Sequence, residues 1–293
     1  MKSIRAASPI LGGCAGSVQN HDQPSEGSMN RQAYLLAVLV LLCPSWAPAE
    51  DAAALAKQLS NPVAALISVP FQSNWEQGIG PDGDGSRYTL NVQPVIPMSI
   101  GEEWNLISRT ILPVVDQWSI FPGAGEQFGL SDTLQSLFFS PKAPTAGGLI
   151  WGAGPVFLLP TATDELLGSE KWGAGPTAVG LVQTGSWTFG MLANHIWSFA
   201  GPSDRADINS TFIQPFLSYS TPTAWTYTLQ TESTYDWEGD QWNVPIAALV
   251  AKVTKIGGQL VQFQAGPRYY AASTESGPDG WAFRFNVVLL FPK

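Results

Sequence analysis

Residues 280–291 have the sequence GWAFRFNVVLLF, in which the side chains alternate in character almost without interruption. Every odd-numbered position from Trp281 to Phe291 is apolar, whereas the even-numbered positions include Arg284 and Asn286. Successive side chains of a β-strand point to opposite faces, so this stretch predicts a strand with one continuous apolar face. One such strand is ordinary, but similar segments precede it along most of the chain.

Twelve segments in all have this character, and each is near the ~9–11 residues that a tilted strand needs to cross a bilayer. They are 63–74, 87–98, 104–115, 130–140, 149–160, 173–183, 186–197, 208–220, 225–236, 242–254, 259–271 and 281–292. Longer polar connections mostly follow the odd-numbered segments, and shorter turns mostly follow the even-numbered ones. This arrangement is typical of outer-membrane barrels. We therefore predict an all-β fold, a closed antiparallel transmembrane β-barrel of about 12 strands formed by residues 61–293.

The composition favours a membrane barrel over a soluble β-domain. Charged residues make up 13% of the chain, against about 25% in a typical soluble domain. The mean hydropathy is only +0.05 because apolar and polar residues are interleaved. The net charge of −9, without a basic run, argues against a nucleic-acid partner.

Tryptophan supplies a second indication, because the indole ring prefers the boundary between lipid and water. Ten tryptophans fall in two groups at the ends of the predicted strands, and Trp118 falls within a predicted loop. The predicted interfacial belt consists of Trp75, Trp104, Trp151, Trp172, Trp187, Trp197, Trp225, Trp237, Trp242 and Trp281. Tryptophans of a soluble core would instead be expected in mid-strand.

The N-terminal region predicts export. Residues 29–49 resemble a signal peptide, with an apolar run at 33–43 and an A-x-A cleavage site at 47–49. Residues 1–28 lie upstream of that signal and are interpreted as a disordered, over-extended start. Residues 50–60 are alanine-rich and predict a short helix or tail.

Polar side chains on the inner face of the predicted strands are candidates for a solute pathway. The lumen-facing candidates are Arg109, Glu232, Asp236, Arg268, Arg284, Gln93, Gln230, Gln262 and Gln264. Two interpretations stay open: a network that fills and rigidifies a narrow barrel, or a constriction that selects a solute. Twelve strands fall between a filled eight-stranded barrel and an aqueous sixteen-stranded one, so strand number does not decide.

Several stretches carry a resemblance to a known family. They include NPVAALISVP at 61–70, WNLISRTILP at 104–113, GPVFLLPTATD at 154–164, NHIWS at 194–198 and ESTYDWE at 232–238. The chain resembles the bacterial outer-membrane transporter family grouped with the phenol meta-pathway (MetA-like) proteins, often mislabelled neuromedin U. The resemblance implies a barrel in the bacterial outer membrane that passes small solutes, aromatic or hydrophobic compounds among them. It implies no catalytic residues.

The predicted partners follow from this location. We expect outer-membrane lipids around the barrel, an unidentified small solute, and the barrel-insertion machinery acting through the C-terminal strand. Barrels are commonly recognised through a final aromatic residue, and here Phe291 is followed by Pro292 and Lys293.

Catalysis and metal binding find little support, and we expect no enzyme activity, no cofactor and no metal. His195 is the single histidine after residue 49. Asn194 and Ser198 are residue types that a hydrolase uses, but strand residues three apart point to opposite faces, which separates His195 from Ser198. The alternatives are an outer-membrane lipid hydrolase using His195, and a soluble periplasmic all-β binding protein. The sequence leaves open the solute, its direction of movement, the oligomeric state, whether the lumen is plugged, and how in-strand prolines are accommodated.

Overall fold

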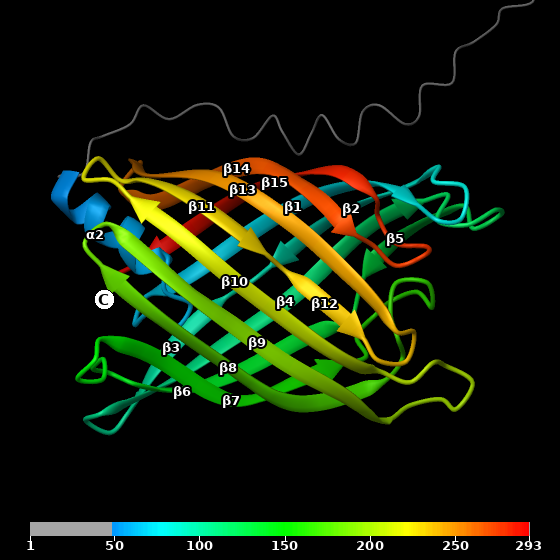
Figure 1. Cartoon of the computed structure of the whole chain (residues 1–293), viewed down its shortest axis with the longest axis horizontal. Coiled ribbons are helices and arrows are strands. Elements are labelled where there is room, and N and C mark those ends of the chain that lie inside the picture. Colours follow the sequence, from blue (N-terminus) through cyan, green and yellow to red (C-terminus); the bar gives the residue numbers. More distant parts are fainter. Residues whose placement is uncertain (1–48, 293) are drawn as a thin grey trace, which may run out of the picture. The chain divides into compact units, whose positions relative to one another are not determined.

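The computed structural model describes residues 49–292, which form a closed antiparallel β-barrel with one short helix (Figure 1). The elements are α2 (Ala49–Leu59), β1 (Ile67–Ile79), β2 (Gly85–Val92), β3 (Val95–Ile100), β4 (Trp104–Trp118), β5 (Glu126–Leu130), β6 (Thr133–Pro141), β7 (Leu149–Leu159), β8 (Trp172–Thr184), β9 (Trp187–Ala200), β10 (Asn209–Ser220), β11 (Trp225–Thr231), β12 (Ser233–Asp236), β13 (Gln241–Ile256), β14 (Gln259–Ala272) and β15 (Gly280–Phe291). The predicted over-extended start and nearly all of the predicted signal peptide lie outside the described residues.

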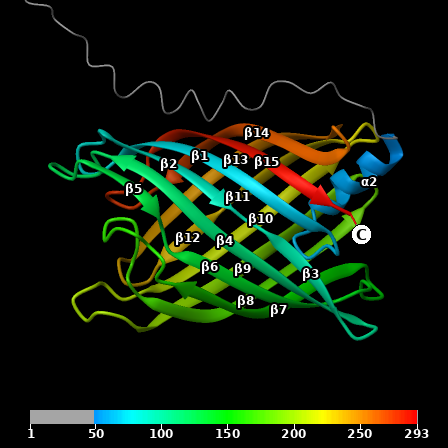
Figure 2. The same cartoon turned by 180° about the vertical axis from the view of Figure 1, so that it is seen from behind.

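The fifteen strand segments make twelve barrel strands. β2 and β3 both pair with β1 and β4, and β5 and β6 both pair with β4. Likewise β11 and β12 lie end to end between β10 and β13. The ring closes because β15 pairs with β1 and β9 pairs with β10 (Figure 2). The predicted fold class and strand number are confirmed.

The pattern of the last strand explains which side faces outward. In β15, Trp281 is 62% exposed, whereas Arg284 is 2% exposed and points into the barrel. The same arrangement recurs in the neighbouring strand β14, with Tyr269 exposed and Arg268 buried. A soluble sandwich would bury the aromatic face, so this barrel has the surface that a bilayer requires.

Several strand boundaries differ from the prediction, among them the start of the first strand and the end of the third. Residues 63–66 were expected to open the first strand, but β1 begins at Ile67, which pairs with Phe291 at the end of β15. Residues 63–66 have no strand partner beyond that point and turn into the barrel, where Val63 is 4% exposed. β4 continues to Trp118 because β5 pairs with its last residues, so Trp118 ends a strand and does not lie within a loop.

Two in-strand prolines coincide with irregularities. Pro94 stands in the gap between β2 and β3, and Pro245 stands at a register shift between β13 and β14. Proline lacks the N–H that a ladder needs, so an interruption or bulge is where it costs least.

A further pair of prolines meets directly, since Pro155 of β7 is opposite Pro176 of β8. Ladder pairs are missing beside each of them, between β6 and β7 and between β8 and β9, although the register is the same on both sides of each gap. A glycine precedes each proline: a Cβ on Gly154 would lie 2.0 Å from the Leu137 carbonyl oxygen, and one on Gly175 would lie 1.7 Å from that of His195. These glycines let the neighbouring backbones approach where the ladders are broken.

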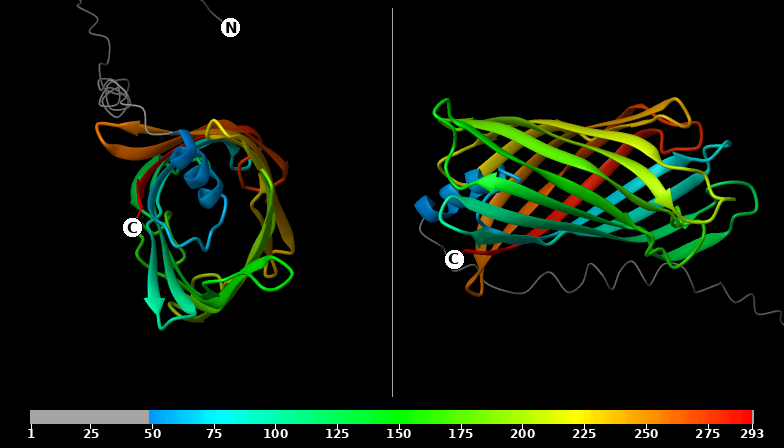
Figure 3. Two further views of the ribbon diagram at one scale, coloured as in Figure 1. Left: turned by 90° about the vertical axis from the view of Figure 1, so that its left-hand side faces the viewer. Right: turned by 90° about the horizontal axis from the view of Figure 1, so that it is seen from below.

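Helix α2 lies across one mouth of the barrel, at the end where β15 finishes (Figure 3). It contacts β10, β11 and β13. Leu55 and Ala56 pack in a cluster with Val253, Val288 and Leu290. The helix ends before Asn61-Pro62, because the residue preceding proline disfavours helical geometry. Within residues 49–292, no helix is both long and apolar enough to span a bilayer.

Candidate functional site

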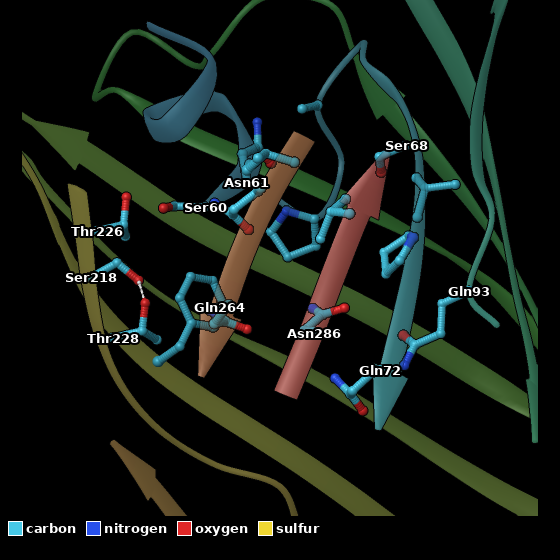
Figure 4. Close-up of a pocket in the computed structure, with 18 of the residues that line it drawn as sticks. Ser60, Asn61, Ser68, Gln72, Gln93, Ser218, Thr226, Thr228, Gln264 and Asn286 are labelled. Atoms are coloured by element: carbon cyan, nitrogen blue, oxygen red, sulfur yellow. Dashed lines mark hydrogen bonds between the residues drawn. The ribbon is translucent and has the colours of Figure 1, made fainter. Parts of the chain in front are cut away.

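Two cavities lie inside the barrel. The first, here named the helix-side cavity, has a volume of about 210 Å³ and is lined by residues 58–62 together with polar side chains of the strands. Figure 4 shows Ser60 and Asn61 on one side of it and Gln72, Gln93, Gln264 and Asn286 on the other. The second, named the mixed cavity, has a volume of about 260 Å³ and combines polar with apolar side chains.

Five side chains line both cavities and form their shared border. They are Gln72, Gln93, Arg109, Gln214 and Glu232. They come from β1, the β2–β3 gap, β4, β10 and the β11–β12 gap, so they surround the lumen from several sides. The two cavities therefore adjoin at this border.

Residues 60–66, here named the luminal segment, cross the barrel next to α2. Val63 packs against Phe138, Leu181 and Leu192 on one side of the barrel. Leu66 packs with the α2 cluster and with Leu290 on the other side. Because consecutive parts of the segment contact opposite walls, the lumen is obstructed at this mouth.

Charged side chains of β1, β14 and β15 form a compact network with Glu232, which lies between β11 and β12. Arg284 donates to both carboxylate oxygens of Glu232, at 2.6 Å from Nη1 to Oε1 and 2.7 Å from Nη2 to Oε2. Its Nε donates to Asn74 Oδ1 at 2.8 Å. Arg268 Nη1 donates to Glu76 Oε1 at 3.0 Å and to Asn74 Oδ1 at 3.2 Å. Paired and hydrogen-bonded in this way, buried charges avoid the cost of desolvation without a partner.

Arg109 stands apart from that network. Its Nη2 donates to Gln93 Oε1 at 3.1 Å. Among the described residues, no carboxylate lies within ion-pairing distance of its guanidinium. Arg109 is half-buried at the shared border.

The two sides of the lumen have different chemistry. The polar wall consists of Gln72, Asn74, Gln262, Gln264, Arg268, Arg284 and Asn286 on β1, β14 and β15. The apolar wall consists of Ile107, Phe138, Val179, Leu181 and Leu192 on β4, β6, β8 and β9. In a ring of twelve strands β15, at the centre of the polar wall, is six strands from β8 of the apolar wall, so the two walls lie on opposite sides of the lumen.

The structure places the predicted lumen candidates as follows. Gln93, Gln230, Gln262, Gln264, Arg109 and Glu232 line the helix-side cavity, and Arg268 and Arg284 join Glu232 in the network. Asp236 is not brought to them and accepts the backbone N–H of Glu238 in its own turn. A role of these side chains in selecting a solute remains a prediction.

Sequence reasoning missed Asn74 and Glu76, which hold the two network arginines. The signal was present, since Gln72, Asn74 and Glu76 alternate with Phe71, Ser73 and Trp75. Ending the predicted strand at 74 placed Glu76 in a loop, whereas β1 continues to Ile79.

His195 lies on the outer surface of the barrel, away from the cavities. Its Nδ1 is 2.7 Å from Thr211 Oγ1, and its ring packs on Trp197 with centroids 4.0 Å apart. Ser198 donates instead to Asp207. Among residues 49–292, the hydroxyl bonded to His195 is that of a threonine, and no group of three or more His, Cys, Asp or Glu side chains is placed to hold a metal ion.

Most of the predicted belt tryptophans are exposed at strand ends, and only Trp151 is half-buried. Several of their rings contact aromatic neighbours on nearby strands. Trp75 lies 5.2 Å from Tyr88, and Trp104 lies 5.9 Å from Trp151, between ring centroids. Their interfacial role remains a prediction.

No family model and no curated protein matches this chain. Among solved structures, it is similar to an outer-membrane channel from Pseudomonas putida F1, with a TM-score of 0.61 and 14% identity over 77% of this chain and 94% of that one. The β-domain of the Bordetella autotransporter BrkA is less similar, with a TM-score of 0.44 and 12% identity over 78% of this chain and 100% of that one. The KdgM porin has a TM-score of 0.39 and 13% identity over 77% of this chain and 99% of that one. The chain has the fold of an outer-membrane β-barrel.

Proposed function

We propose that this chain is an outer-membrane channel that passes small solutes through its barrel without covalent chemistry. The observation that carries the proposal is a closed barrel whose outer surface is apolar and whose interior holds two cavities with a polar border between them. The solved channel with the same fold supports it.

Small aromatic or hydrophobic compounds are the proposed solutes, in keeping with the predicted phenol meta-pathway grouping. The mixed cavity supports this choice, because Ile111, Leu134, Leu192, Ile196 and Phe212 give it an apolar side. An apolar cavity of about 150 Å³ is enough to hold benzene in another protein. The mixed cavity, at about 260 Å³, therefore has room for a single-ring compound.

The two alternatives have less support. A lipid hydrolase needs a nucleophile beside His195 and a third group to orient the ring. The partners of His195 are Thr211 and Trp197. A soluble binding protein would not expose Phe189, Leu229 and Trp281 on the outside of the same barrel.

Single-channel recording of the purified full-length protein in planar bilayers tests the proposal. We expect small, discrete currents in potassium chloride, limited by the luminal segment. In Val63→Ser, the anchor of that segment in the apolar wall is weakened, so conductance should rise.

Ala65→Ser is the matched control, because Ala65 lies on the same segment but is exposed. Its conductance should equal that of the unchanged protein. A barrel that shows a heat-modifiable gel shift, and so is folded, yet never conducts or takes up a solute would overturn the channel proposal.

A further inference from the structure

The charges of the network in the middle of the lumen do not balance once Arg109 is counted. Arg268 and Arg284 are offset by Glu76 and Glu232, which they contact directly. Arg109 adds one further positive charge at the shared border. The carboxylate that shares this border is that of Glu232, but both of its oxygens already accept from Arg284.

Arg109 therefore has donors to offer. A guanidinium carries five N–H donors in a planar fork that matches a carboxylate. One donor of Arg109 is directed at Gln93 Oε1. The group borders both cavities, so the remaining donors are beside open space rather than packed against a second charge.

The apolar residues of the mixed cavity give this charge a chemical context. Ile111 lies two residues after Arg109 on β4, on the same face of the strand. Leu192 and Ile196 of β9, Leu134 of β6 and Phe212 of β10 complete the apolar lining. One cavity thus combines a cation with a hydrocarbon surface.

We infer that the mixed cavity binds a small organic anion, a carboxylate with an apolar body, with the carboxylate on Arg109 and the body against Ile111, Leu192, Ile196 and Phe212. This deepens the proposed function and rests on it, since the bound anion is the solute that the channel passes. A cation is disfavoured at Arg109, and a neutral compound leaves the guanidinium donors without a charged acceptor. Selectivity arises because only an amphipathic anion satisfies both parts of the cavity.

Four probes of similar or smaller size separate the two contributions. Benzoate has the charge and the ring, benzyl alcohol has the ring alone, benzylammonium has the opposite charge, and acetate has the charge without the ring. Binding to the purified full-length barrel in detergent is measured by saturation-transfer NMR, and block of the potassium chloride current is measured in bilayers. We expect benzoate to bind at least 10-fold more tightly than each of the other three.

Substitutions then test whether Arg109 supplies the positive charge that binds the carboxylate. Arg109→Gln should weaken benzoate binding about 10-fold or more and leave benzyl alcohol unchanged. The affinity of Arg109→Lys for benzoate should lie between those of the unchanged protein and Arg109→Gln, because an ammonium keeps the charge but lacks the planar fork of donors. Arg87→Gln is the matched control: Arg87 is also inside the barrel, donates to Gln117 Oε1 at 2.9 Å, and lines neither cavity. It should bind benzoate as tightly as the unchanged protein.

Equal binding of benzoate and benzyl alcohol by the unchanged protein would overturn the inference, whatever the variants do. Equal losses of benzoate binding in Arg109→Gln and Arg87→Gln would also overturn it, because the total positive charge inside the barrel, and not Arg109 itself, would then account for the binding. A barrel that conducts but shows no preference for benzoate defeats the inference alone. A barrel that binds benzoate through Arg109 but never conducts supports the site and defeats the channel proposal.

Discussion

The polar and apolar walls of the lumen are built by the same kind of strand yet are stabilised in different ways. On the apolar wall, Phe138 and Leu181 are 1% exposed and pack against Val63, as in the core of a soluble protein. On the polar wall, Arg284 is 2% exposed and is held by Glu232 and Asn74. One wall depends on close packing and the other on complete pairing of charges. The cavities lie where neither kind of contact closes the space.

Breaking the charge pairing should have the largest effect. Glu232→Gln removes the carboxylate that Arg284 and Arg268 share, so two buried guanidinium groups lose their common partner. The free energy of unfolding should fall by about 4 kcal/mol, measured by urea titration in lipid vesicles. Glu102→Gln makes the same chemical change at an exposed turn position and should cost less than about 0.5 kcal/mol. Equal losses in the two variants would show that the network contributes no stability.

Breaking the packing of the apolar wall should have the next largest effect. Leu181→Ala leaves a void between Val63 and the wall, and the free energy of unfolding should fall by about 3 kcal/mol. Leu217→Ala truncates a leucine that is 42% exposed on the outside of β10. Lipid chains are as apolar as leucine and fill the space, so the same titration should show a much smaller loss. If the outer substitution costs as much, the apolar wall is not a packed core.

The smallest expected effect concerns the loops next to β8 and β9 of the apolar wall. There the charges lie outside the lumen: Lys171 Nζ donates to Asp207 Oδ1 at 2.9 Å, and Ser198 donates to the same oxygen at 3.1 Å. These hydrogen bonds and the Lys171 charge hold the pKa of Asp207 below its usual value.

Because the pKa of Asp207 is lower in the folded protein than in the unfolded chain, its ion pair stabilises the loops at pH values above the pKa of the unfolded chain. This stabilisation is lost as the pH falls through the pKa of the folded protein. Below about pH 4 the loops should therefore become more sensitive to acid-active proteases. Asp207→Asn should show that sensitivity already at pH 7, measured with a protease that is active at neutral pH, with the barrel itself unchanged. An identical cleavage pattern at both pH values would contradict the expectation.

The strands were predictable because a bilayer imposes a strict alternation on each of them. β15 was predicted as 281–292 and runs from Gly280 to Phe291, since lipid outside and a lumen inside leave no freedom in the pattern. The strand break at Glu232 was not visible, because Thr231 and Ser233 continue the β-favouring sequence on both sides. Breaks and register shifts depend on the neighbouring strands, which the sequence of one strand does not contain.

The sequence alone determined a twelve-stranded barrel with an apolar exterior, and it supplied most of the polar side chains that border the cavities. Tertiary structure decided that Val63 turns inward to cross the lumen, that Asn74 and Glu76 join Arg268 and Arg284, and that Arg109 is left with Gln93. The physical reason is that alternation assigns each side chain to a face. Which charges meet is set by strand order and register around the closed ring.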